Sequence, residues 1–234
     1  MKQKVLKKRG AWTFSGKLPD VFYSHIKKSV PLYEEGHKII LQTSDFFLKD
    51  NSICYDLGCS SLDLLVKLSK FSNKKIKLIG VDCEKDMVKF CKKRISKEKI
   101  SNINIFCKDI HKMNLLKSDL IISYYTMQFI APKFRQAIIN KIYKSLNWGG
   151  AFICFEKIRG ADARFQDIFV SLYNDFKEDN GFSLNEINNK QKSIRGILEP
   201  FSEQGNLGLL KRAGFRDIAG IMQFINFKGY LCIK

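Results

Sequence analysis

Short apolar runs alternate with amphipathic segments along most of this chain. The apolar runs lie within 52–60 and at 76–81, 104–107, 119–125 and 151–155, and their lengths are typical of strands. Segments with an apolar residue every three or four positions lie between several of them, at 61–69, 85–95 and 132–146, and predict helices. Strands that alternate with helices in this way favour an α/β fold with a mostly parallel sheet.

Further helices are expected before the first strand and after the fifth. Pro19 begins an amphipathic segment that Pro31 ends, and 32–48 predicts a second helix. After 158 the alternation pauses, and three more helices are predicted at 161–177, 183–198 and 207–212. Ser183 and Glu186 are spaced as a capping box at the start of the second of these.

The last two apolar segments, at 217–222 and 229–233, predict a strand pair that completes a seven-stranded, mostly parallel sheet. We therefore expect one domain over 1–234. Within it, 1–50 form a basic arm and a helical cap, and 158–212 form a helical insert before the last strands.

The ends of the first two strands carry the residues of a nucleotide site. Gly58 follows the first strand in the sequence Asp-Leu-Gly-Cys-Ser, where a residue without a Cβ permits a sharp turn and a close approach to a ligand. Asp82 ends the second strand, the position from which α/β folds bind ribose hydroxyls. A dinucleotide fold requires G-x-G-x-x-G, whereas Gly58 stands alone. We therefore favour a class I S-adenosylmethionine (SAM) fold, which is Rossmann-like.

Other candidate site residues have two interpretations each. Asp109 and Ile110 follow the third strand and could bind an adenine amino group and pack its ring, or Asp109 could cap the next turn. Tyr33 could pack in the core or extend its hydroxyl into the pocket. Glu156 and Lys157 end the fifth strand, where the lysine could hold a substrate carboxylate or the two could be a plain strand-end pair.

Composition narrows the class of protein further. A hydrophobic share of 45% supports a folded globule, and no apolar run approaches the roughly 18 residues of a membrane helix. Seven cysteines without a C-x-x-C pair fit free thiols in a reducing cytoplasm. The three histidines are scattered, so we predict no metal. The net charge of +18 is spread over the whole length, which is more typical of a solvated surface than of an RNA groove. The charge therefore does not predict direct RNA contact, and it leaves such contact open.

Several motifs together resemble the carboxy-S-adenosylmethionine synthase family. They are Trp12-Thr13-Phe14, Ser29-Val30-Pro31-Leu32-Tyr33, Tyr55-Asp56-Leu57-Gly58-Cys59-Ser60, Thr126-Met127-Gln128-Phe129-Ile130, Glu156-Lys157, Asp175-Phe176-Lys177 and Gly181-Phe182-Ser183. The resemblance covers nearly the whole chain. It implies a transferase that converts SAM and prephenate to carboxy-SAM and phenylpyruvate, for modification of wobble uridine in transfer RNA. It also implies a cytoplasmic homodimer.

The resemblance assigns positions for SAM or carboxy-SAM residue by residue. They are Tyr33, Gly58, Cys59, Ser60, Asp82, Cys83, Asp109, Ile110 and Tyr124. Two of these depart from the family, which has asparagine at the positions of Cys83 and Tyr124. No catalytic residue is assigned.

The most consequential departure is Gln191, which aligns with the family arginine that pairs with the new carboxylate across the dimer interface. Glutamine donates hydrogen bonds but lacks the charged bidentate fork of arginine. Arg195, four residues further along the same predicted helix, could supply the missing cation, or it could be an exposed surface residue. Alternatively, the protein is an ordinary SAM-dependent methyltransferase of unknown acceptor, or a relic that only binds the nucleoside.

Overall fold

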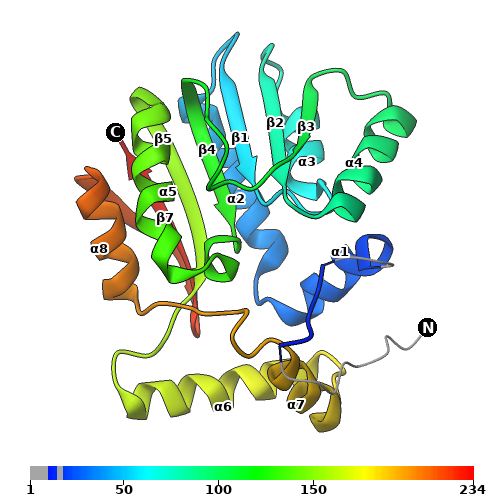
Figure 1. Cartoon of the computed structure of the whole chain (residues 1–234), viewed down its shortest axis with the longest axis vertical. Coiled ribbons are helices and arrows are strands. Elements are labelled where there is room, and N and C mark those ends of the chain that lie inside the picture. Colours follow the sequence, from blue (N-terminus) through cyan, green and yellow to red (C-terminus); the bar gives the residue numbers. More distant parts are fainter. Residues whose placement is uncertain (1–9, 15–17) are drawn as a thin grey trace.

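The computed structural model describes residues 10–14 and 18–234, which form a seven-stranded sheet in the order β3-β2-β1-β4-β5-β7-β6 (Figure 1). The basic arm predicted at the N-terminus lies largely outside these residues. The strands are β1 (Ile53–Leu57), β2 (Lys77–Asp82), β3 (Ile103–Cys107), β4 (Ser118–Tyr124), β5 (Leu146–Lys157), β6 (Asp217–Phe224) and β7 (Phe227–Ile233). Strands β1 to β5 pair in parallel, whereas β7 is antiparallel to both β5 and β6. The predicted seven-stranded, mostly parallel sheet is confirmed.

Helices cover both faces of the sheet and the edge where the parallel strands end (Figure 1). They are α1 (Leu18–Ser29), α2 (Tyr33–Phe47), α3 (Asp63–Phe71), α4 (Lys85–Glu98), the short 3-10 helix η1 (Met127–Phe129), α5 (Pro132–Ser145), α6 (Ala163–Asp179), α7 (Leu184–Ser193) and α8 (Glu203–Ala213). Helices α2, α3 and α4 pack on one face, and α5 and α8 pack on the other. Helices α1, α6 and α7 lie beyond the carboxyl ends of β1 to β5, as a cap.

The period-2 alternation of strand side chains divides the core into two buried clusters, one on each face. Cys54 of β1 belongs to the cluster under α2 and α3, and its neighbour Tyr55 belongs to the cluster under α5. Both are almost completely buried, as expected for a parallel strand that is covered on both sides.

The strand order reverses direction between β1 and β4. The chain runs from β1 outward to β2 and β3, then crosses back to β4 on the other side of β1. The loops after β1 and β4 therefore diverge and leave a crevice at the carboxyl edge, which is where open α/β sheets bind ligands. This edge faces the cap helices.

The two largest errors in the predicted element boundaries concern β5 and α7. The fifth strand was expected at 151–155, but β5 begins at Leu146, which pairs with Ser118. The pairing register between β4 and β5 shifts between Ser118 and Leu120, and Asn147 donates to the Asp119 Oδ1 oxygen at 2.8 Å. Residues 147–150, with their two glycines, are therefore an irregular stretch inside β5.

The second error concerns α7. Its predicted capping box is confirmed, with Ser183 Oγ accepting from the Glu186 N–H, but the helix ends at Ser193 and not at 198. Gly196 has a φ of 75°, a left-handed conformation that does not continue a helix. Arg195 consequently lies in the turn after α7, so the argument that it shares a helix face with Gln191 was wrong.

Within the described part of the chain, none of the helices is both long and apolar enough to cross a lipid bilayer.

Candidate functional site

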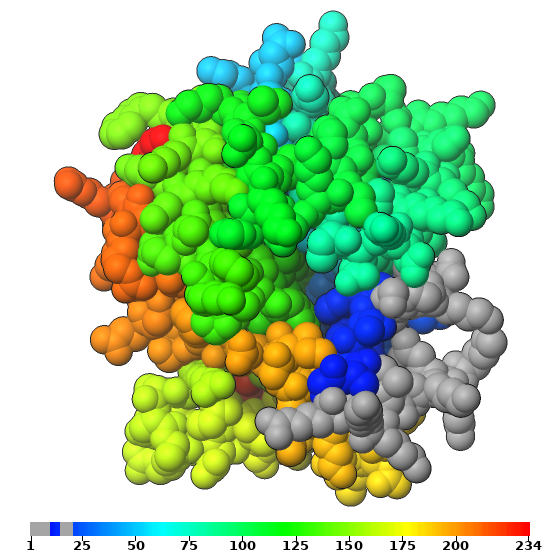
Figure 2. Space-filling view, viewed as in Figure 1, coloured from blue at the N-terminus to red at the C-terminus, as the bar shows by residue number. Residues whose placement is uncertain are grey.

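A cavity of about 1450 Å³ lies between the carboxyl edge of the sheet and the cap. Its walls come from α1, α2, the loops after β1, β2, β3 and β4, the end of β5, and helices α6 and α7. In the space-filling view a hollow opens among the green surface of η1 and α5, the teal surface of α4 and the blue surface of α1 (Figure 2). The volume exceeds the ~300–1,000 Å³ of an ordinary ligand pocket, so it is large enough for more than one small molecule.

The cavity brings together ten of the eleven predicted site residues. They are Tyr33, Gly58, Cys59, Ser60, Asp82, Cys83, Asp109, Ile110, Tyr124 and Gln191. Arg195 does not line the cavity and its side chain is exposed. The structure therefore gives no support to Arg195 as a substitute for the family arginine.

The loop after β1 is a tight cradle. Gly58 has a φ of 88°, and a Cβ built on it meets Thr126 Oγ1 at 2.2 Å and Thr126 Cγ2 at 2.4 Å. Ser60 and Leu62 also have positive φ, at 46° and 72°. Successive backbone turns of this kind point N–H groups toward a ligand, and only glycine leaves room for Thr126 above the first of them.

The end of β2 anchors this cradle. Asp82 Oδ2 accepts from the Ser60 N–H at 3.0 Å, and Asp82 Oδ1 accepts from the Glu84 N–H at 2.9 Å. Burial raises the pKa of Asp82, and these backbone N–H groups oppose that shift. The neighbouring Cys83 is exposed at the rim, where burial of part of its side chain raises the thiol pKa to about 11. A protonated thiol contributes little hydrogen bonding to a ligand.

Asp109 shows the capping behaviour that was one of its two interpretations. Its Oδ1 oxygen accepts from the His111 N–H at 2.8 Å, which closes the turn after β3. The side chain is nevertheless exposed to the cavity, next to the buried Ile110. The two interpretations are therefore compatible.

Tyr33 and Tyr124 form the wall between α2 and β4. The Tyr124 hydroxyl donates to the Tyr33 carbonyl at 2.7 Å, and the two rings lie 5.1 Å apart. Gly36 permits this contact, since a Cβ there would lie 2.2 Å from the Tyr124 hydroxyl oxygen. Tyr33 belongs to the core cluster, as its first interpretation predicts, and it also lines the cavity. A role of its hydroxyl in the pocket stays a prediction.

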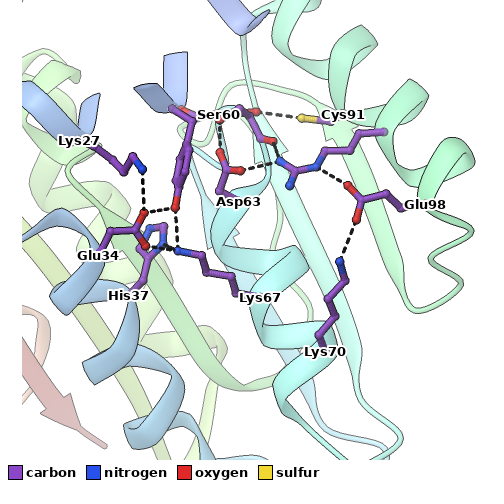
Figure 3. A network of polar contacts seen from close by, with 12 residues as sticks. Lys27, Glu34, His37, Ser60, Asp63, Lys67, Lys70, Cys91 and Glu98 are labelled. Carbon is purple, nitrogen blue, oxygen red and sulfur yellow. Dashed lines mark hydrogen bonds and ion pairs between the residues drawn. The ribbon is translucent and has the colours of Figure 1, made fainter. Parts of the chain in front are cut away.

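A polar network joins the cap to the body beside this wall (Figure 3). Glu34 of α2 accepts from Tyr23 of α1 and from Lys67 of α3. Lys67 Nζ also lies 3.0 Å from the Tyr23 hydroxyl and 3.1 Å from His37 Nδ1. Burial lowers the pKa of His37 to about 3, so the ring is neutral and accepts from Lys67. The network fixes α1 and α2 on α3.

A second part of the network supports the cradle from behind (Figure 3). Arg94 of α4 donates to Asp63 Oδ1 at 2.6 Å and to the Ser61 carbonyl at 2.8 Å. Cys91 donates through its thiol to the Ser60 carbonyl at 2.9 Å. These contacts explain how the strained conformations of Ser60 and Leu62 are held.

Sequence analysis missed Asp56, which lies on β1 two residues before Gly58. Its carboxylate is buried and lines the cavity, and within the described residues its Oδ1 oxygen has no hydrogen-bond partner. Burial raises its pKa to about 7, and the negative charge of Asp82 adds to the shift. An acidic residue inside a buried strand was the available signal. A carboxylate oxygen of this kind is suited to bind a cationic group of a ligand.

Glu156, singled out at the end of β5, has a supporting role. It is buried, does not line the cavity, and accepts from the Met127 N–H at 3.0 Å. Its neighbour Lys157 does line the cavity, and the Lys157 N–H donates to Gln128 Oε1 at 2.7 Å. Glu156 and Gln128 thus hold the loop of η1 over the cavity. Among the described residues, no group of three His, Cys, Asp or Glu side chains is arranged to hold a metal.

The sheet order, the glycine cradle and the carboxylate at the end of β2 define the class I fold of SAM-dependent methyltransferases. Residues 54–150 match the family described as a methyltransferase domain. A crystal structure of a SAM-dependent methyltransferase from Aquifex aeolicus superposes with a TM-score of 0.60 at 17% identity, covering 90% of this chain and 97% of that chain. This similarity shows the fold.

Curated relatives place the chain more narrowly. A carboxy-S-adenosyl-L-methionine synthase of Campylobacter lari is 33% identical over 100% of both chains. One of Ruthia magnifica is 36% identical and covers 95% of this chain and 94% of the relative. The chain belongs to the carboxy-S-adenosyl-L-methionine synthase family.

Proposed function

We propose that this protein binds SAM and transfers a carboxyl group from prephenate to the methyl carbon, giving carboxy-SAM, phenylpyruvate and water. The observation that carries the SAM part of the proposal is the cradle at Gly58, in a cavity that gathers ten of the eleven expected residues. The proposed reaction itself is supported by membership of the carboxy-SAM synthase family.

Two features of the cavity fit SAM. The backbone turns at Gly58, Ser60 and Leu62 have positive φ and line the cavity at Gly58 and Ser60, and the unpartnered Oδ1 of Asp56 matches the ammonium group of the methionine part. We assign the ribose to Asp82 and the adenine to Asp109 and Ile110, which lie on the neighbouring strand ends. When bound, SAM supplies a methyl carbon made acidic by the adjacent sulfonium.

The chain's own residues orient and enclose the reactants. Gln128 and Phe129 of the η1 loop line the cavity, and Glu156 holds that loop through the Met127 N–H. Helices α1, α6 and α7 cover part of the carboxyl edge and line the cavity. Positioning two bound molecules in this way is the main contribution that such a site makes to the rate.

A second function is ordinary methyl transfer, favoured by Gln191. The glutamine side chain carries no charge, and its Nε2 already donates a hydrogen bond to Asn174 Oδ1 at 3.2 Å. Methyl transfer needs no cation for a new carboxylate, only alignment of the acceptor with the sulfonium.

We extend the proposal to the protein's assembly and pathway. Large apolar side chains are exposed on α6 and at the end of β6, a pattern that supports a homodimer formed through this side of the molecule. They are Phe165, Ile168, Leu172 and Phe224. We also propose one domain over 1–234, a cytoplasmic location, and a product destined for wobble uridine of transfer RNA. Direct RNA contact is not part of the proposal.

Incubation of the full-length protein with SAM, with and without prephenate, tests the reaction. Mass spectrometry of the nucleoside is expected to show the gain of one carbon dioxide only when prephenate is present. Loss of the methyl group to an acceptor supports the second function instead. Light scattering of the protein in solution tests the dimer.

A further inference from the structure

Two lysines lie beside one tyrosine ring in the part of the cavity next to β5. Lys157 is the last residue of β5, and its Nζ lies 4.0 Å from the centre of the Tyr173 ring. Lys177 lies one turn along α6 from Tyr173, and its Nζ is 4.2 Å from the same ring centre. All three residues line the cavity, and Lys177 is only 8% exposed. Two ammonium groups from distant parts of the sequence therefore meet at one place.

Among the described residues, neither ammonium group forms an ion pair with a carboxylate. Glu156 is adjacent to Lys157 in the sequence, but its carboxylate binds the Met127 N–H and lies outside the cavity. Lys177 Nζ donates to the neutral Asn174 Oδ1 at 3.0 Å.

Both lysines have a lowered pKa, which reflects the electrostatic cost of this arrangement. Burial, together with repulsion from Lys177, lowers the pKa of Lys157 to about 7. Burial lowers the pKa of Lys177 to about 8, with Glu178 opposing the shift. The Tyr173 ring attracts both cations but does not neutralise them. Buried charges without a partner are unfavourable in a free protein, and a bound anion removes the cost.

Asn174, which lines the cavity, links Lys177 to Gln191. Asn174 Oδ1 accepts from both Lys177 Nζ and Gln191 Nε2, so its own NH₂ group points away from them as a donor. The aromatic surroundings decide between classes of anion. Tyr173 and Phe227 lie beside Lys157, and such a wall fits an organic acid with an unsaturated ring better than inorganic phosphate.

We propose that Lys157 and Lys177, which both lie beside the Tyr173 ring, bind the carboxylate of the organic acid that is the second substrate. This inference rests on the proposed function, because it deepens the assignment of the same cavity. The lysines are binding residues, distinct from the groups assigned to SAM.

Binding measurements on the full-length protein test the inference without requiring turnover. Lys157→Met and Lys177→Met remove the charges and keep most of the side-chain volume, and Lys89→Met on the exposed face of α4 is the matched control. Calorimetry first measures the affinity for SAM, and then titrates the protein saturated with S-adenosylhomocysteine, which lacks the reactive methyl group, with prephenate and with phenylpyruvate. We expect each cavity variant to bind both acids at least about tenfold more weakly, with SAM affinity within about twofold of the wild type.

Charge-retaining variants separate loss of charge from damage to the fold. Lys157→Arg and Lys177→Arg are expected to bind the acids better than the methionine variants. Unchanged acid affinity in both methionine variants overturns the inference, as does a wild type that binds neither acid. Weaker binding of carboxy-SAM with unchanged binding of prephenate also overturns it, because the cations would then serve the product.

The same variants distinguish failure of this inference from failure of the proposed function. If prephenate binds through the lysines but no carboxy-SAM forms, the inference stands and the reaction fails. If carboxy-SAM forms equally well in the methionine variants, the reaction stands and the inference fails.

Discussion

Replacing Gly58 with alanine tests the cradle on which SAM binding depends. Two costs follow from the structure. The first is backbone strain, because a non-glycine residue at a φ of 88° costs roughly 1–2 kcal/mol. The second is steric, because the new Cβ lies 2.2 Å from Thr126 Oγ1 and 2.8 Å from Thr126 Cβ, and overpacking of this kind costs typically 1–3 kcal/mol.

The sum predicts a loss of about 2–5 kcal/mol in the free energy of unfolding. For a chain of this size each kcal/mol lowers the melting temperature by roughly 2–4 °C. Displacement of Thr126 also disturbs the loop over the cavity, so we expect the affinity for SAM to fall by at least about tenfold. Urea unfolding and calorimetry with SAM measure the two effects.

Gly149→Ala provides the control, because it separates strain from the clash. Gly149 has a φ of 73° but no atom within 4 Å of a built Cβ, so it carries only the first cost. In the double variant Gly58→Ala with Thr126→Gly, the clashing side chain is absent and the steric cost is expected to disappear, after allowance for Thr126→Gly alone. The reasoning is refuted if Gly58→Ala destabilises the protein no more than Gly149→Ala does.

Three further predictions concern the charges of the site. Gln191→Arg restores the family cation and is expected to strengthen binding of carboxy-SAM over SAM by about 10- to 100-fold; an unchanged ratio of the two affinities contradicts this role for the position. Burial raises the pKa of Asp56 to about 7, and a bound ammonium group favours the ionised carboxylate. SAM affinity should therefore rise between about pH 6 and 7.5 in the wild type and lose this slope in Asp56→Asn, and a variant with the same slope excludes Asp56 as the partner. Burial raises the pKa of Glu156 from 4.5 to about 8, so its protonated form favours folding and this contribution is lost as the pH rises toward 8. Glu156→Gln keeps the acceptor for the Met127 N–H and should flatten stability between about pH 5 and 8, measured by urea unfolding at each pH; an unchanged slope would show that Glu156 is ionised in the fold.

The sequence determined most of the secondary structure of this protein, and the two strand ends at which a nucleotide is expected. Hydrophobic periodicity reports local conformation, because the side chains that create it lie within a few residues of one another. Gly58 and Asp82 could be predicted as site residues for the same reason, since each directly follows a short apolar run. The departure at Gln191 was also a property of the sequence alone.

Only the tertiary structure decided how distant residues meet. The unpartnered oxygen of Asp56, the contact of Thr126 with Gly58, and the meeting of Lys157 with Lys177 depend on how strands pair and how α6 packs over their ends. Arg195 was misjudged because a single left-handed glycine ends α7 early. Periodicity cannot predict such features, because burial and charge at one residue are set by elements that lie far away in the chain and close by in space.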